Sequence, residues 1–137
     1  MTVPKVTKRD FKPFGKVSSL TLGGGGIGGS WGSTDRSEAV ATVNLALEAG
    51  IDHFDVAPMY GRGEAERVLG EAFRDKDLSN IRLTTKCLLG DIPGEQVYDH
   101  LETSLARSMR SIGVEKIDLF LLHSQLVSDG TDNLFMF

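Results

Sequence analysis

Strand-like and helix-like segments alternate along most of this 137-residue chain, and that alternation restricts the possible folds more than any other feature. Short apolar runs rich in β-branched and aromatic residues are each followed by a longer segment with apolar residues three or four positions apart. Strands separated by helices pair in parallel through right-handed crossovers. The sequence therefore predicts an α/β fold with a parallel sheet, organised as one domain over residues 1–137.

The expected elements begin with a short hairpin at residues 9–22, with Gly15 in its turn. The strands are then expected at 20–26, 51–57, 81–89 and 116–123, and the helices at 33–50, 63–73 and 95–113. Thr34 or Asp35 caps the first helix, which Gly50 ends, and Gly113 ends the third. The residues expected on apolar helix faces are Val40, Val43 and Leu47, then Ala65, Val68, Leu69, Ala72 and Phe73, and finally Val97, Leu101, Leu105 and Met109.

Composition narrows the classes of partner. The chain has 15 basic and 19 acidic residues, a formal net charge of −4, which disfavours a nucleic-acid binder. Its single cysteine, Cys87, excludes an intrachain disulfide and suits a reducing compartment. No apolar run approaches the roughly 18 residues of a membrane span, and the first residues lack the apolar core of a secretory signal. We expect a cytoplasmic protein without a membrane, nucleic-acid or metal partner.

Polar residues stand at the ends of the predicted strands. Asp55 closes the strand at 51–57, Lys86 lies near the end of the next, and His123 closes the last. Tyr60 follows Asp55 by five residues, in the adjoining loop. Because the carboxyl ends of parallel strands share one face of the sheet, these side chains are expected to gather where α/β enzymes build their active sites.

Together these side chains suit the protonation of a carbonyl group. A tyrosine has a reference pKa near 10, and a neighbouring lysine cation lowers it by favouring the phenolate. An aspartate would hold that lysine charged, and a histidine could donate a hydrogen bond to a carbonyl oxygen. None of these groups supplies hydride, so the chemistry calls for a nicotinamide cofactor.

Each residue also has a simpler interpretation when it is taken alone. Asp55 could form a turn, Tyr60 could pack, Lys86 could lie at the surface and His123 could be a core histidine. It is their joint placement at successive strand ends that favours a site.

Four stretches then resemble motifs of the aldo-keto reductases. The stretch GIDHFDVAPMYGRGEAERVLGEAF resembles the signature region of that family, LTTK its third-strand lysine and IDLFLLH its fourth-strand histidine. The stretch VSSLTLGGGGIGG resembles the first strand with its nicotinamide-side loop, preceded by the hairpin of the family. The motifs occur in order, and the resemblance covers residues from about 9 to 124.

The resemblance implies an NADPH-dependent reductase of aldehydes, ketones or sugars on a (β/α)8 TIM barrel. Asp55, Tyr60, Lys86 and His123 would be the catalytic tetrad, with Tyr60 as general acid. Gly24, Gly25 and Asp55 would lie near the nicotinamide end of the cofactor. Trp31 would form a wall of the substrate pocket, or alternatively an anchor for its own loop.

This sequence is shorter than the barrel of that family. A barrel of this kind takes about 250 residues, whereas this sequence provides the first four βα units and then a stretch without periodicity that ends in the apolar residues 134–137. In the family, the cofactor phosphates bind to later units. An inactive truncated or regulatory protein, a self-pairing half-barrel, or one half of a two-part barrel is therefore the alternative hypothesis.

The glycine run supports one more interpretation. Gly23, Gly25 and Gly28 satisfy the G-x-G-x-x-G pattern of doubly wound dinucleotide-binding domains. That pattern requires a helix to begin within the motif, whereas the expected cap lies several residues later. We therefore rank this fold below the barrel.

Overall fold

The computed structural model of the chain describes residues 3–124. Its elements, in order, are β1 (Lys8–Phe11), β2 (Gly15–Ser18), β3 (Leu22–Gly23), α1 (Gly24–Ile27), α2 (Arg36–Glu48), β4 (His53–Asp55), α3 (Glu64–Phe73), β5 (Arg82–Cys87), the 3₁₀ helix η1 (Gly94–Gln96), α4 (Val97–Ile112) and β6 (Leu119–Leu122). The predictions about the apolar residues 134–137 and the end of the domain lie outside the described residues.

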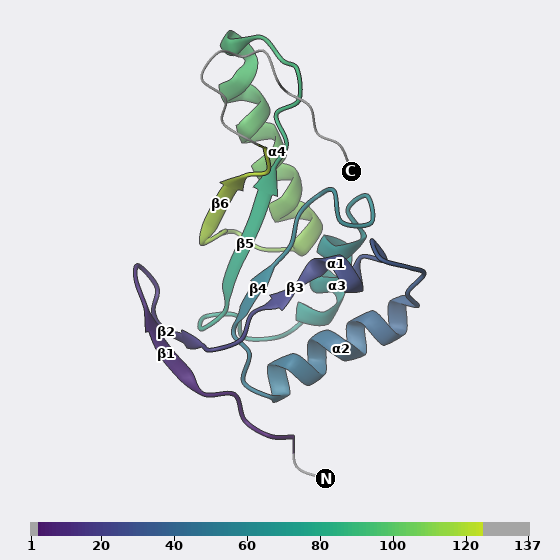
Figure 1. The fold of residues 1–137 in the computed structure, drawn as a ribbon, viewed down its shortest axis with the longest axis vertical. Coiled ribbons are helices and arrows are strands. Elements are labelled where there is room, and N and C mark those ends of the chain that lie inside the picture. The colour runs from purple at the N-terminus through teal and green to yellow at the C-terminus, as the bar shows by residue number, and fades with distance from the viewer. Residues whose placement is uncertain (1–2, 125–137) are drawn as a thin grey trace.

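Four strands form one parallel sheet in the order β3-β4-β5-β6 (Figure 1). Phe54 pairs with Leu22 on one side and with Leu83 on the other, and Lys86 pairs with Leu121. Each strand thus lies beside its predecessor in the chain, as in a barrel. A doubly wound sheet reverses its strand order at a switch point, so the dinucleotide-fold interpretation of the glycine run is wrong.

The hairpin of β1 and β2 is confirmed, and it lies near the amino ends of the sheet strands (Figure 1). Gly15 is the first residue of β2, opposite Phe11, and its φ of 74° turns the chain into that strand. The carboxylate of Asp52, just before β4, accepts a hydrogen bond from the Ser18 backbone N–H at 2.7 Å and pairs with Lys8. The hairpin is therefore attached to the sheet by polar contacts.

The signals predicted for both ends of α2 and for the end of α4 are confirmed. Asp35 rather than Thr34 caps α2, because its side chain accepts hydrogen bonds from the backbone N–H groups of Ser37 and Glu38. Gly50 and Gly113 have φ values of 86° and 78° just after α2 and α4. Such left-handed conformations suit glycine and end helices.

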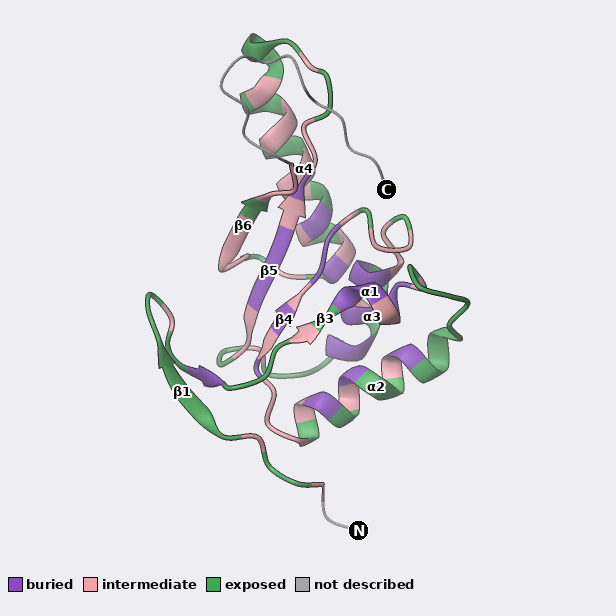
Figure 2. Ribbon diagram, viewed as in Figure 1, coloured by how far each residue is buried: buried purple, intermediate pink, exposed green. Residues whose placement is uncertain are grey.

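Burial differs among the helices (Figure 2). All five predicted apolar residues of α3 are buried, together with Glu66. In α2, Val43 is buried as predicted, whereas Ala39 and Ala46 are buried in place of the half-exposed Val40 and Leu47. In α4 the four predicted residues are only half-buried, and Ser108 and Ile112 are the buried ones. The core accordingly gathers around Phe54, Val43 and the inner face of α3.

The glycine run differs from the prediction. The strand expected at 20–26 is limited to Leu22–Gly23, and residues Gly24–Ile27 form the short helix α1. Glycine carries no periodic signal and disfavours helix, so the residues of this turn do not by themselves predict a helix. Among residues 3–124, the structure contains no helix long and apolar enough to cross a membrane.

Candidate active site

The predicted polar residues meet at the carboxyl ends of the sheet strands. Asp55 is the last residue of β4, Lys86 is the fifth of six residues in β5, and His123 follows β6 directly. Tyr60 lies in the loop between β4 and α3, where its backbone N–H donates to the carbonyl of Ala57 at 3.0 Å. The parallel sheet thus brings together side chains that are up to 68 residues apart, from Asp55 to His123.

Lys86 is the centre of this group. Its Nζ donates hydrogen bonds to Oδ1 of Asp55, to the backbone carbonyl of Val56 at 3.0 Å and to the hydroxyl oxygen of Tyr60 at 3.2 Å. The Lys86 side chain is only 11% exposed. An ammonium group has three protons to donate, so these three acceptors satisfy it. The contacts hold a positive charge beside the tyrosine hydroxyl.

His123 completes the group from the edge strand. Its ring packs edge-on against the Tyr60 ring, with centroids 5.7 Å apart and planes at 90°. Burial lowers the pKa of His123, and the positive charge of Lys86 lowers it further, while Asp55 acts in the opposite direction. A neutral imidazole has one N–H to donate. Among residues 3–124, the buried Nδ1 of His123 has no hydrogen-bond partner.

Glycines allow the loop of Tyr60 to pack against α1. A Cβ on Gly24 would lie 2.8 Å from Val56 and 3.2 Å from the Tyr60 ring. A Cβ on Gly61 would lie 1.7 Å from the carbonyl oxygen of Gly28, and the φ of Gly61 is 61°. Close approach of two backbones therefore explains why glycines occur here.

Trp31 lies beside the glycine run but away from the core. The residue is 86% exposed, and a Cβ on Gly25 would lie 2.9 Å from the Trp31 ring. The ring therefore covers Gly25. That contact fits the interpretation of Trp31 as an anchor for its own loop. The role of Trp31 as a wall of the substrate pocket stays a prediction.

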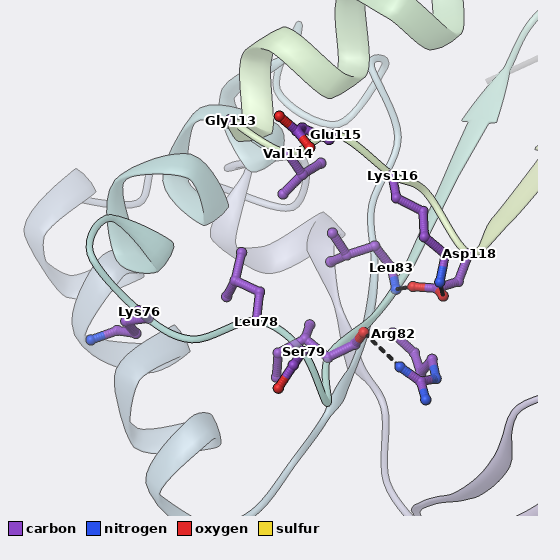
Figure 3. Close-up of a pocket in the computed structure, with 11 residues that line it drawn as sticks. Lys76, Leu78, Ser79, Arg82, Leu83, Gly113, Val114, Glu115, Lys116 and Asp118 are labelled. Atoms are coloured by element: carbon purple, nitrogen blue, oxygen red, sulfur yellow. Dashed lines mark hydrogen bonds and ion pairs between the residues drawn. The ribbon is translucent and has the colours of Figure 1, made fainter.

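Two cavities lie at opposite ends of the strands. Lys86 and His123 line one of about 170 Å³, together with Met59, His100 and Arg107. A second, of about 400 Å³, lies among the amino end of β5 and the loops after α3 and α4 (Figure 3). None of the predicted site residues lines the second cavity. In barrels of this kind the amino end serves stability and the carboxyl end serves catalysis.

One buried carboxylate near the site was not among the predicted site residues. Glu66 in α3 is 2% exposed, and its Oε1 accepts a hydrogen bond from Oγ1 of Thr85 at 2.9 Å. A signal was available, because Glu66 precedes Leu69 by three residues and Phe73 by seven, which places it on the apolar face of the helix.

Comparisons with known proteins agree with this architecture. Residues 19–135 match the profile of the Aldo/keto reductase family. Aldo-keto reductase YhdN of Bacillus subtilis (strain 168) is 31% identical over 115 residues, which cover 79% of this chain and 34% of that protein. The NADH-specific methylglyoxal reductase of Escherichia coli (strain K12) is 29% identical over 128 residues, covering 81% and 39%.

Solved structures show the same fold. The holo form of aldo-keto reductase AKR11C1 from Bacillus halodurans superposes with a TM-score of 0.73 at 25% identity, over 93% of this chain and 43% of that one. An aldo-keto reductase from Klebsiella pneumoniae in complex with NADPH gives 0.70 at 24% identity, over 91% and 41%.

The extent of these matches confirms the predicted fold class. The chain spans 34% and 39% of the length of the two curated relatives. Its four parallel strands and their helices correspond to the first half of the (β/α)8 barrel of the aldo-keto reductases. The fold and the family profile together show that this chain belongs to the aldo/keto reductase family of oxidoreductases.

Proposed function

We propose that this chain carries the proton-donating half of a carbonyl reductase site that acts on small aldehydes, ketones or sugars with a nicotinamide cofactor. The observation that carries the proposal is the contact of Lys86 Nζ with both the Asp55 carboxylate and the Tyr60 hydroxyl. A lysine held charged beside a phenol favours transfer of the phenolic proton.

Each residue has a distinct part in the proposal. Tyr60 donates the proton to the carbonyl oxygen of the substrate as the carbonyl carbon accepts hydride. Lys86 stabilises the resulting phenolate, and Asp55 keeps Lys86 charged and oriented. His123 is neutral at neutral pH because its pKa is lowered by burial and by Lys86, and it orients the carbonyl through one N–H donor.

The residues present fit the nicotinamide end of such a cofactor. The Asp55 side chain is 36% exposed, and within residues 3–124 only its Oδ1 accepts a side-chain hydrogen bond. Oδ2 therefore suits a ribose hydroxyl. The cofactor supplies the hydride when it is bound. We propose NADPH as the first cofactor to test. The methylglyoxal reductase of Escherichia coli is NADH-specific, whereas the aldo-keto reductase of Klebsiella pneumoniae was solved with NADPH, so both dinucleotides belong in the experiment.

A second candidate function follows from the open edge of the sheet. β6 is an edge strand of the described sheet, and Leu121 is 37% exposed. An unpaired strand of this kind can pair with another chain. The alternative is therefore a half-barrel that acts through pairing, with itself or with a second half, and has no turnover alone. A cytoplasmic location belongs to both proposals.

The deciding experiment combines binding and turnover. NADPH and NADH are titrated against the fluorescence of Trp31, the single tryptophan of the chain, and oxidation of the bound cofactor is then followed with a panel of aldehydes and ketones. Saturable binding with turnover supports the reductase. Two results contradict the reductase proposal for this chain and favour the pairing protein. One is saturable binding without turnover, and the other is the absence of binding in a folded sample.

The general-acid assignment has a matched control within the chain. Tyr60→Phe is expected to lower kcat by at least about a hundredfold, because general acids contribute this much or more, with little change in cofactor affinity. Tyr98 is the other tyrosine, lies exposed on α4 and contacts Glu102. Tyr98→Phe should leave kcat unchanged. Similar kcat values for Tyr60→Phe and Tyr98→Phe would exclude Tyr60 as the general acid.

A further inference from the structure

A buried carboxylate, Glu66 of α3, is hydrogen-bonded to the residue of β5 that precedes Lys86. Glu66 is 2% exposed and Thr85, its hydrogen-bond donor, is 0% exposed. Within residues 3–124, no lysine, arginine or histidine forms an ion pair with Glu66. Burial of a carboxylate without a cation is costly. The rest of the buried face of α3 is apolar, so packing alone does not explain a glutamate at this position.

Thr85 connects Glu66 to the strand of the catalytic lysine. Thr85 and Lys86 are neighbours in β5, and side chains of successive strand residues point to opposite faces of a sheet. Lys86 contacts Asp55 on the inner face, while Thr85 contacts α3 on the outer face. The hydrogen bond from Thr85 to Glu66 therefore fixes β5 against α3 one residue away from Lys86.

The same turn of α3 also holds Tyr60. The backbone N–H of Ala65, the residue before Glu66, donates to the backbone carbonyl of Tyr60 at 3.2 Å. Two consecutive helix residues thus contact the loop of the tyrosine and the strand of the lysine. α3 therefore contacts both the loop that carries Tyr60 and the strand that carries Lys86, and the hydroxyl of Tyr60 lies 3.2 Å from Nζ of Lys86.

We infer that Glu66 is a positioning residue, which acts through Thr85 to set the distance between Lys86 and Tyr60. The inference rests on the proposed function, because that function assigns the proton transfer to Tyr60 and Lys86. Positioning of these two residues is a different role for Glu66 from a contribution to stability alone. Replacing both partners of a buried hydrogen bond by apolar groups of the same shape can leave stability nearly unchanged, so stability and positioning can be separated by mutation.

The test therefore compares an apolar pair with conservative changes in the full chain. Glu66→Leu combined with Thr85→Val removes the hydrogen bond but fills the space, whereas Glu66→Gln and Thr85→Ser keep an acceptor and a hydroxyl. The double variant is expected to keep its melting temperature and lose about tenfold or more in kcat at unchanged KM, since small misplacements of reacting groups cost this much. The conservative variants should retain most of kcat.

A second readout needs neither cofactor nor substrate. In a Tyr98→Phe background Tyr60 is the only tyrosine, so the alkaline rise in ultraviolet absorbance reports Tyr60 alone. The double variant should shift this titration to higher pH, because a more distant Lys86 stabilises the phenolate less. Glu66→Gln should titrate as the unmodified chain does. If the double variant does not fold, Thr85→Val alone serves the same comparison.

The two readouts distinguish failure of the inference from failure of the proposed function. A folded double variant with an unshifted tyrosine titration overturns the positioning role, whatever its activity. A shifted titration in a chain that reduces no carbonyl supports the positioning of Tyr60 and Lys86 by Glu66, and contradicts the proposed reductase activity of this chain.

Discussion

The middle of the sheet and its β6 edge are built from similar sequence patterns but are buried to different degrees. Around β4, β5 and α3, Phe54 and Leu69 are 0% exposed. At the edge, Leu121 of β6 is 37% exposed, and the apolar face of α4 is only half-buried (Figure 2). An apolar stripe on a helix shows that the helix can be covered. Whether it is covered depends on which elements lie beside it.

This difference divides the candidate site. Asp55, Tyr60 and Lys86 belong to the covered middle and contact one another through hydrogen bonds. His123 follows the edge strand and contacts Tyr60 only through ring packing at 5.7 Å. Tyr60 and Lys86 are thus held by the core of this chain, whereas His123 lies beside the less covered region.

The largest contrast is expected between two glycines. Gly61→Ala places a Cβ 1.7 Å from a backbone oxygen of Gly28, at a φ of 61°. We expect a loss of more than about 3 kcal/mol in the free energy of unfolding, or no folded protein. Gly113 has a φ of 78°, but a Cβ there would meet open space. Gly113→Ala should therefore lower the free energy of unfolding by only about 1 kcal/mol. Urea unfolding measures both, and equal losses would contradict the close packing of Gly61.

Core truncation gives the next contrast. Leu69→Ala in α3 removes a fully buried side chain and should cost about 2–5 kcal/mol. Leu105→Ala in α4 removes a half-buried one and should cost about 1 kcal/mol. Chemical denaturation of the two variants under the same conditions compares the regions directly. A loss for Leu105→Ala as large as that for Leu69→Ala would mean that α4 is covered in solution.

The smallest expected effect is a pH dependence from two histidines. Burial lowers the pKa of His53 and of His123 below the ordinary value of 6.5, against the pull of Asp55. The unfolded chain therefore takes up these protons first as pH falls. The two neutral histidines therefore contribute to the free energy of unfolding in full above about pH 6.5. This contribution is lost as the pH falls from there through the lower pKa values of the folded chain.

NMR titration of the histidine ring protons measures the two pKa values. In addition, His53→Asn and His123→Asn should each flatten the dependence of the free energy of unfolding on pH below about pH 6.5. Both ring nitrogens of His53 take part in hydrogen bonds, Nδ1 with the hydroxyl of Thr21 and Nε2 with the hydroxyl of Thr84. A neutral ring donates one of these bonds and accepts the other, and together they place His53 in the covered region. A His53 signal that titrates above 6.5 would contradict the burial described for the middle of the sheet.

Much of the site could be predicted, because it depends on order along the chain. Asp55, Lys86 and His123 stand at strand ends, and in a parallel sheet those ends meet on one face. Glu66 could not be placed with the same ease, since a glutamate near a helix N-terminus usually faces solvent. The short helix at Gly24–Ile27 was also missed, because glycines carry no helical signal and the turn depends on contacts with the Tyr60 loop.

The sequence by itself determined the alternation of strands and helices, the caps at Asp35, Gly50 and Gly113, and the meeting of the strand ends. These properties follow from local spacing and local backbone preferences. Only the tertiary structure decided that Lys86 reaches Tyr60 at 3.2 Å, that Glu66 is buried and that α4 stays half-covered. Distance and burial depend on residues far apart in the chain, and the local pattern of a helix or strand carries no information about those neighbours.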